Sequence, residues 1–310
     1  MLNTMPDMDI KKEKPKVYGL SFWPRLLRNL SLWVPSVVLA IVALVAIFAD
    51  LSWLGLPDVS IAPYPPNEQH MTDRRMPPAF MEGGSTKYIL GTDNLGRDIL
   101  SRSIFGARIS LSVALIVIAI TATAGTTLGV AAGYMGGRTE GFIMRVTDVA
   151  LAFPGLLLAM LLSVSVGPGY WTVVLALSIL GWAPYARLIR GESLRLRSSD
   201  FVAQARIIGC SPWRIMFRHV FPNVINPLIV VMTMAVGMMI LSEAALSYLG
   251  IGIPPPNPSW GAMVADGRAQ LDRAWWISTI PGILIGLVVL SGNFLGDWLR
   301  DKFDPRLRQI

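Results

Sequence analysis

The stretch that decides the fold is "DFVAQARIIGCSPWRIMFRHVFPN", residues Asp200–Asn223, which lies between two long apolar runs. It holds three arginines, a histidine, an aspartate and, near its middle, a glycine. Charged side chains of this kind are costly inside the hydrocarbon of a membrane. The segment is therefore predicted to be a polar connection between two membrane crossings.

The composition of the whole chain supports a membrane protein. Of 310 residues, 53% are hydrophobic and only 15% are charged, and the mean hydropathy is +0.53. Soluble domains carry about 25% charged residues, so the chain is predicted to be an all-α polytopic membrane protein. The net charge of +7 is divided among clusters between apolar runs. Nucleic-acid binding, which needs a continuous basic surface, is not expected.

Six apolar runs approach or exceed the roughly 20 residues that a helix needs to cross the hydrocarbon. Gly181 and Pro184 interrupt the fourth run, which membrane helices tolerate when neighbours satisfy the backbone. The first run follows 30 residues and precedes no A-x-A site, so a retained helix is expected rather than a signal peptide. The six predicted spans are Ser31–Ala49, Ile109–Gly133, Val149–Val166, Trp171–Ile189, Val224–Leu249 and Ile277–Gly296.

Lysine and arginine positions predict the orientation. With the N-terminus in the cytoplasm, the cytoplasmic segments hold 19 of these residues and the outer segments hold eight. The positive-inside rule therefore places both termini in the cytoplasm. The expected order is a cytoplasmic segment 1–30, a first helix 31–49, an outer loop 50–108, five helices within 109–298 joined by a cytoplasmic connection at 190–223, and a tail 299–310.

The outer loop ends in "YILGTDNLGRDILSRSIFGARISL". From Asp98 onward, Ile99, Leu100, Ile104 and Phe105 recur at helical spacing, with arginines away from them. This pattern predicts a short amphipathic helix on the outer membrane surface.

Small residues recur every four positions in two of the spans: Gly125, Gly129 and Gly133 in the second, and Gly282 and Gly286 in the last. Glycines at this spacing let helix backbones approach closely. Packing within the chain is favoured, and a contact between subunits is the alternative.

Two carboxylates lie in or beside the spans. Asp148 follows Arg145 by three residues and is expected to pair with it along the helix. Glu243 lies within the fifth span, towards its outer end, where a carboxylate suggests a role in a transport pathway. The alternative is that Glu243 caps or bonds a neighbouring helix.

Signatures of catalysis are missing from the sequence. There is one cysteine, Cys210, with two distant histidines, His70 and His219, so no metal-ligand set is expected. The phosphate-cradling G-x-x-x-x-G-K-[ST] motif, H-E-x-x-H and G-x-S-x-G are all absent. The chain is predicted to be non-catalytic, with no metal or cofactor site of its own.

The opening stretch divides into two short helices. In the first, Phe201, Ala205 and Ile208 share a predicted apolar face, and Gly209 ends the helix. Ser211 followed by Pro212 is a strong start signal for the second. There, Trp213, Met216, Phe217 and Val220 are expected to lie together, with Arg214 and Arg218 on another face.

Two functions fit a short, exposed basic segment with an aromatic knob at Phe201. It can dock in a groove of a partner protein, or it can rest on anionic lipid through its basic face. The spacing of the residues leaves both open.

A family resemblance decides between them. The stretch resembles the cytoplasmic "EAA" loop of ABC-importer permeases, the segment that meets the ATPase subunit. From about Phe22 to Arg308, the chain resembles the C-type permease of the dipeptide/oligopeptide/nickel family. The motifs that carry the likeness are "LGTDNLGRDILSRSIFGARISL", "RVTDVALAFPGLLLA", "SEAALSYLGIGIPPPNPSWGAMVADGR" and "NFLGDWLRDKFDPRLRQ".

The resemblance implies a type I ABC-importer fold in the bacterial inner membrane. The implied partners are a second permease, two ATPase subunits that hold ATP and Mg²⁺, an extracytoplasmic binding protein, and membrane lipid. The cargo would be a dipeptide, an oligopeptide or a related small solute. The implied ATPase-contacting residues are Asp200, Phe201, Ala203, Gln204, Ala205, Arg206, Gly209 and Ser211.

One departure from the family pattern matters. The Glu-Ala-Ala of the loop falls on Ala203, Gln204 and Ala205, so its glutamate is lost, whereas Arg206 and Gly209 match. Contact through shape and Phe201 is expected, without a salt bridge from position 203.

An ion-coupled secondary transporter is the rival class. It would need intramembrane ionisable groups, for which only Asp148 and Glu243 are candidates, and usually repeated halves, which the sequence lacks. A membrane-embedded enzyme is disfavoured by the missing motifs.

Overall fold

All regular structure in the described part of the chain is helical. The structure, a computed structural model, describes residues 22–51 and 60–303, with side chains from Leu32 onward. Within these ranges the only extended pairing is an isolated bridge between Thr92 and Asp98. The predicted all-α class is therefore confirmed for the described residues.

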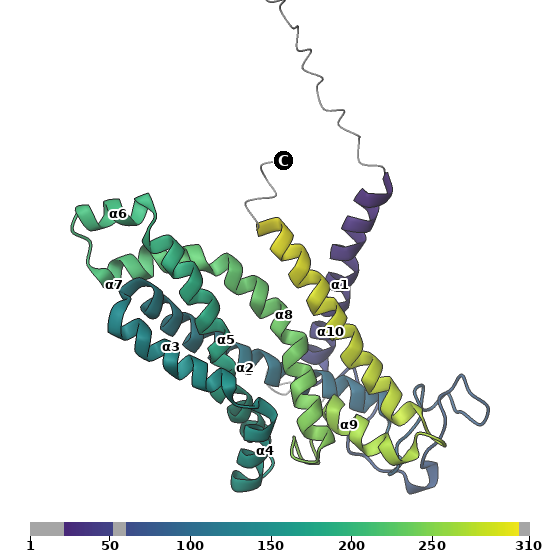
Figure 1. Ribbon diagram of the computed structural model, residues 1–310. Coiled ribbons are helices and arrows are strands. Elements are labelled where there is room, and N and C mark those ends of the chain that lie inside the picture. Colours follow the sequence, from purple (N-terminus) through teal and green to yellow (C-terminus); the bar gives the residue numbers. More distant parts are fainter. Residues whose placement is uncertain (1–21, 52–59, 304–310) are drawn as a thin grey trace, which may run out of the picture.

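The long helices are apolar enough to cross a membrane (Figure 1). Four candidate spans meet this test: α2 (Ile99–Met135), α5 (Tyr170–Arg197), the run Pro212–Tyr248 that contains α8 (Phe221–Tyr248), and α10 (Trp276–Phe303). Helices α3 (Gly137–Ala152) and α4 (Gly155–Val166) give a fifth candidate if counted together, although an 80° bend separates them. In α1 (Phe22–Phe48), the described apolar run is shorter, Leu32–Phe48.

The helices divide the molecule into two ends (Figure 1). The short helix α6 (Asp200–Ile207) lies at the same end as the beginning of α1 and the end of α10. Helix α4, helix α9 (Trp260–Gly267) and the 60–98 loop lie at the other end. These are called the α6 end and the α9 end below.

Glycines bring α2 and α5 into backbone contact. A methyl group on Gly125, Gly129 or Gly133 would lie 2.4, 2.8 or 2.6 Å from a carbonyl oxygen of α5, those of Trp182, Ala186 and Arg190 respectively. Carbon and oxygen atoms cannot approach so closely, so only glycine permits this packing. The predicted close contact within the chain is confirmed, and α2 packs more extensively on α5 than on any other element of the described chain.

The corresponding prediction for α10 is wrong. Nothing lies within 4 Å of a methyl group placed on Gly282 or Gly286. Helix α10 instead meets α8 through two other glycines: a methyl on Gly237 would lie 2.9 Å from the Cα of Val289, and one on Gly296 would lie 2.3 Å from the Cγ of Met234. Glycine spacing alone does not reveal which turn of a helix faces its neighbour.

The separate surface helix predicted from Asp98 is also wrong, because these residues form the first turns of α2. Asp98 caps the helix: its Oδ2 accepts hydrogen bonds from the backbone N of Ser101 at 2.8 Å and from the Oγ of Ser101 at 2.7 Å. Beyond the cap, α2 continues unbroken to Met135. The turns are buried because Gly106 packs against Trp260, whose Nε1 donates to the carbonyl of Ser103 at 2.9 Å.

The 60–98 loop is fastened to this end of α2. The backbone N of Tyr64 donates to Ser101 Oγ at 3.0 Å. Within the loop, Lys87 and Tyr88 both donate to Asp73 Oδ2, at 3.2 and 3.0 Å. The hydrogen bond from Lys87 is the main reason that the pKa of Asp73 lies below its usual value.

Ion pairs fix α3 against α5. Asp148 accepts a hydrogen bond from Arg187 of α5, so the expected pairing with Arg145 along α3 is wrong. A second pair joins the same two helices: Arg190 Nε of α5 donates to Glu140 Oε1 of α3 at 2.8 Å. Asp148 pairs with Arg187 because α3 and α5 lie side by side. The sequence spacing within α3 cannot reveal this neighbour.

We expect Gly129→Ala to destabilise the protein by about 1–3 kcal/mol, because the added methyl overlaps α5 backbone. The matched control is Gly286→Ala, which adds the same methyl to a span where nothing lies within 4 Å. Thermal unfolding of the purified protein in detergent measures the difference. Equal midpoints for the two variants would contradict the packing described for α2 and α5.

Candidate functional site

The segment between α5 and α8 forms a tight helical hairpin. After α6, Gly209 adopts φ +85°, a left-handed conformation that favours glycine. Helix α7 (Pro212–Ile215) then begins with proline at its first turn, and Ser211 Oγ accepts a hydrogen bond from the N of Arg214 at 3.4 Å. The predicted stop at Gly209 and start at Ser211 are both confirmed.

The buried face of α6 differs from the predicted one. Val202 and Ala205 are buried, whereas Phe201 is 39% exposed and Ile208 is 80% exposed. Ile207 is also 85% exposed. The predicted apolar face is therefore only partly the packed one: Ala205 packs together with Val202 on the core at Ile215 and Val220, whereas Phe201 and Ile208 stay outside it. Large apolar side chains remain on the outside of the hairpin.

The other predicted residues of this segment are on its surface. Asp200, Ala203, Gln204, Arg206, Gly209 and Ser211 are all exposed. The guanidinium of Arg206 lies over the ring of Tyr134 at the end of α2, 5.3 Å from its centroid, and Arg206 Nη2 donates to the carbonyl of Arg197 at 3.4 Å. Arg206 thus joins the hairpin to both α2 and α5.

The aromatic side chains after α7 form an exposed stack. A π-helical run, η3 (Met216–Val220), follows α7 and leads directly into α8. Trp213 and Phe217 are exposed and stack at 6.2 Å, whereas Met216 and Val220 are buried. The four residues expected to lie together therefore divide into an inner and an outer row. Arg214 and Arg218 are exposed as predicted.

Glu243 is fully buried and connects three helices. Its two oxygens accept hydrogen bonds from Ser110 Oγ of α2 at 3.1 Å and from Ser247 Oγ of α8 at 2.7 Å. Ser110 Oγ in turn accepts from the backbone N of Trp260, the first residue of α9, at 3.3 Å. In this conformation Glu243 bonds a neighbouring helix, and its role in a pathway stays a prediction.

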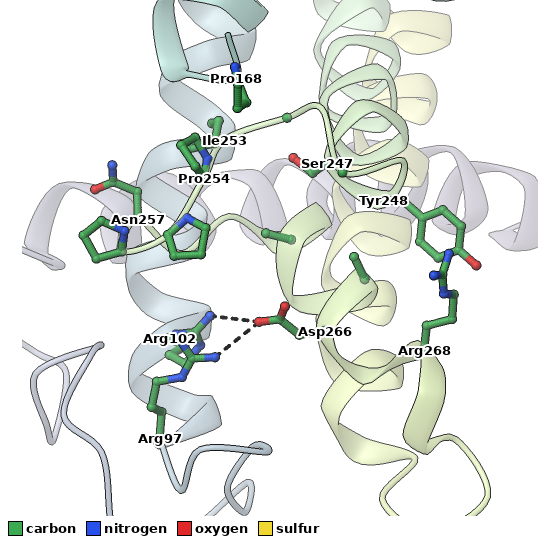
Figure 2. Close-up of a pocket in the computed structure, with 16 residues that line it drawn as sticks. Arg97, Arg102, Pro168, Ser247, Tyr248, Ile253, Pro254, Asn257, Asp266 and Arg268 are labelled. Atoms are coloured by element: carbon green, nitrogen blue, oxygen red, sulfur yellow. Dashed lines mark hydrogen bonds and ion pairs between the residues drawn. The ribbon is translucent and has the colours of Figure 1, made fainter. Parts of the chain in front are cut away.

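A pocket at the α9 end was missed by the sequence reasoning (Figure 2). Its volume is about 340 Å³, and Arg97, Arg102 and Asp266 meet at one side of it. We call it the arginine pocket. Asp93 Oδ1 accepts from the backbone N of Leu95 at 2.8 Å, which makes "GTDNLGRD" the predicted turn. A local signal for the pocket exists only in this turn, because Asp266 comes from a distant part of the sequence.

Potential metal ligands in the described part of the chain do not form a cluster. Across residues 22–51 and 60–303, no group of three or more histidine, cysteine, aspartate or glutamate side chains could hold a metal ion. Cys210 is a free, partly buried cysteine.

Comparison with known proteins identifies relatives over most of the chain. The family described as "Binding-protein-dependent transport system inner membrane component" matches residues 125–309. The dipeptide transport system permease protein DppC of Escherichia coli is 43% identical over 93% of this chain and 93% of its own length. The corresponding protein of Haemophilus influenzae is 39% identical over 95% of this chain and 97% of its own. The di/tripeptide transport system permease protein DppC of Pseudomonas aeruginosa is 43% identical over 80% and 82%.

A solved structure shares the fold. It shows inward-facing conformations of the MetNI methionine ABC transporter, and a chain of it matches with a TM-score of 0.54 and 15% identity. The match covers 64% of this chain and 95% of that chain.

We expect Glu243→Ala to lower stability by about 1–3 kcal/mol, because two buried hydroxyls lose their acceptor. Glu243→Gln retains an amide oxygen and should cost less. Ser242→Ala is the control, because Ser242 is only half-buried and its hydroxyl donates to the carbonyl of Met238 within the same helix. The unfolding midpoint in detergent is the measurement, and a Glu243→Ala midpoint equal to that of Ser242→Ala would show that the hydroxyl contacts contribute nothing.

Proposed function

The chain belongs to the family of binding-protein-dependent transport system inner membrane components, and on this premise we propose that it forms half of a translocation path for small peptides. It is a multi-pass inner-membrane permease subunit of an ABC importer. The peptide cargo is proposed from relatives that are 39–43% identical and named for dipeptide or di/tripeptide transport.

The proposed assembly contains four further components. A second, homologous permease completes the path, and two ATPase subunits hold ATP and Mg²⁺ and carry out hydrolysis. A substrate-binding protein delivers the peptide from outside. Support for these partners comes from the family, whose members depend on binding proteins.

We place both termini and the α6 end in the cytoplasm, with six crossings in total. The beginning of α1 and the end of α10 lie at the same end as α6 (Figure 1), as this topology requires. The excess of lysine and arginine in the segments of that end supports the orientation. The arginine pocket then faces the extracytoplasmic side.

The observation that carries the coupling proposal is the exposed apolar surface of α6, formed by Phe201, Ile207 and Ile208. Short amphipathic helices with such anchors dock in hydrophobic grooves of partner proteins. Ala203 offers no charge to that partner, so the contact depends on shape.

Movement of α6 would reach the membrane by two routes. The first runs from α6 into α5, which is in backbone contact with α2 at Gly129. The second runs through α7 and η3, which continue directly into α8. Closure of the ATPases on ATP would therefore tilt α2, α5 and α8 together, as a rigid-body switch between inward-open and outward-open states.

Ion-coupled transport is the second candidate, favoured only by the presence of Glu243 within a span. A carboxylate there can serve as a proton site in some transporters. Its two hydroxyl partners give it a packing role in the present conformation. Uptake driven by an ion gradient without ATP would establish this alternative and overturn the ABC mechanism.

We expect Phe201→Ala to reduce ATP-driven uptake of Ala-Ala about tenfold or more, because burial of this ring at the partner interface contributes about 1.5–3 kcal/mol. Uptake is measured in proteoliposomes with all partner subunits, together with retention of the ATPases by the permease. Phe80→Ala is the control for ATPase retention, since Phe80 is also exposed but lies in the 60–98 loop. Full ATPase retention and uptake by Phe201→Ala would contradict the coupling role.

We expect Gly209→Pro to abolish coupling while the protein still enters the membrane. Proline fixes φ near −65°, which is incompatible with +85° at this turn, so α6 would be reoriented. Gly209→Ala should have a smaller effect, since alanine pays about 1–2 kcal/mol in the left-handed region. Gly191→Ala is the control, because Gly191 lies within α5 and nothing lies within 4 Å of a methyl group added there. The readout is the stimulation of ATP hydrolysis by the peptide-bound binding protein. Normal stimulation in Gly209→Pro would refute the proposed coupling through α6.

A further inference from the structure

The arginine pocket has the dimensions of a small-ligand site. It lies between the start of α2, the turn that follows α8, and α9 (Figure 2). Small-molecule sites are commonly clefts of about 300–1,000 Å³, and this one is about 340 Å³. Its lining also includes a run of three prolines, Pro254–Pro256, followed by Asn257.

Two buried guanidiniums in the pocket share their carboxylate partners. Arg97 Nη2 and Arg102 Nη2 lie 3.3 and 3.5 Å from the same oxygen of Asp266, and the two dashed lines of Figure 2 mark these pairs. Behind them, Arg97 Nε and Arg102 Nε lie 2.6 and 3.6 Å from the same oxygen of Asp93.

Arg102 is therefore incompletely satisfied. Its remaining contact is a hydrogen bond of 3.4 Å to the carbonyl of Pro66. Charge-assisted hydrogen bonds between guanidinium and carboxylate are usually about 2.7–2.9 Å long, and a guanidinium has five donors. The separations at Arg102 are longer, so an acceptor that lies closer to its guanidinium would form stronger hydrogen bonds.

The lining of the pocket carries an excess of positive charge. A third guanidinium, that of Arg268, lies over the Tyr248 ring at 5.1 Å, and no carboxylate among the described residues lies within 4 Å of it. Three arginines thus line the pocket with one carboxylate, that of Asp266. Asp266 is also the exposed member of the cluster, with 44% of its side chain accessible, whereas Asp93 is buried. A cavity of this charge attracts anions.

The geometry favours a carboxylate over other anions. The chain already places one carboxylate, Asp266, between the two guanidiniums, so a planar group of this size fits. Because Asp266 is held at only 3.3 and 3.5 Å and is half exposed, a ligand carboxylate can take its place or join it. The pocket volume suits a peptide of two or three small residues.

We propose that the arginine pocket binds the free C-terminal carboxylate of a small peptide at Arg97 and Arg102, while Arg268, which lies beside Tyr248 in the lining, adds positive charge that attracts the peptide (Figure 2). The inference rests on the proposed function, because it names the part of the peptide that this permease recognises. Asp266 acts as an internal substitute that occupies the guanidiniums while no peptide is bound. A peptide with an amidated C-terminus lacks the charge and is held only weakly.

The test uses the permease pair with its ATPases in lipid nanodiscs, without the binding protein. The probes are Ala-Ala and Ala-Ala amide, and saturation-transfer NMR titrations give their apparent Kd. We expect Asp266→Asn to tighten Ala-Ala binding about tenfold, because the competing carboxylate is removed. Arg268→Gln should weaken it about tenfold, and neither variant should alter the weak binding of the amide.

Opposite effects of two neighbouring substitutions cannot arise from simple loss of folding. Asp272→Asn, an exposed carboxylate just beyond α9 that does not line the pocket, is the control and should leave the Kd of Ala-Ala unchanged. Changes of the same sign in Asp266→Asn and Arg268→Gln, or equal binding of Ala-Ala and its amide, would overturn the proposal.

Two further outcomes are distinguishable. If Arg268→Gln weakens capture of the peptide-free binding protein and leaves Ala-Ala binding intact, the pocket docks an acidic side chain of that protein, and the proposal is wrong. If the wild-type complex with binding protein and ATP takes up Ala-Ala and yet binds Ala-Ala and its amide with equal Kd, this inference alone fails. Absence of all ATP-driven peptide uptake would instead refute the proposed function.

Discussion

The backbone contact between α2 and α5 is the constraint on which the rest of the structure depends. At Gly125, Gly129 and Gly133 the two helices approach so closely that a single methyl group would overlap α5 carbonyl oxygens. Packed interiors respond to force by moving as units, because they have no free volume in which to deform. We therefore expect α5 to tilt together with α2, and the proposed displacement of α6 would carry both helices.

The second connection to α2 is polar and lies towards the α9 end. Glu243 of α8 reaches Ser110 of α2, and the same hydroxyl accepts from the first backbone N–H of α9. Since α8 is continuous with the hairpin through η3, both routes from α6 converge on α2. The arginine pocket lies where α2 begins, so the proposed binding there and the proposed movement of α6 would both act on this helix. This arrangement is what an ATP-driven importer subunit needs in order to relate events on its two sides.

Local signals predicted the elements well, and tertiary contacts explain the failures. The hairpin was readable because a glycine stop and a Ser-Pro start are properties of the backbone itself, at Gly209 and Ser211. The face of α6, the partner of Asp148 and the course of α2 beyond Asp98 were not, since each depends on which helix lies alongside. The arginine pocket was missed for the same reason, because Arg97 and Asp266 become neighbours only when α9 packs beside α2.

The length of α2 has a consequence of its own. Its 37 residues span about 55 Å, whereas the hydrocarbon core of a bilayer is about 30 Å thick. An untilted α2 would thus extend about 25 Å in total beyond the hydrocarbon core, into the headgroup regions and the water, and α2 is one continuous helix over this length. In a continuous helix, the number of residues between two side chains sets both the distance between them and the angle between their directions around the helix axis. One inserted residue between Arg102 and Gly125 would turn the guanidinium by about 100° relative to the glycine stripe, so the length of this interval is as constrained as its composition.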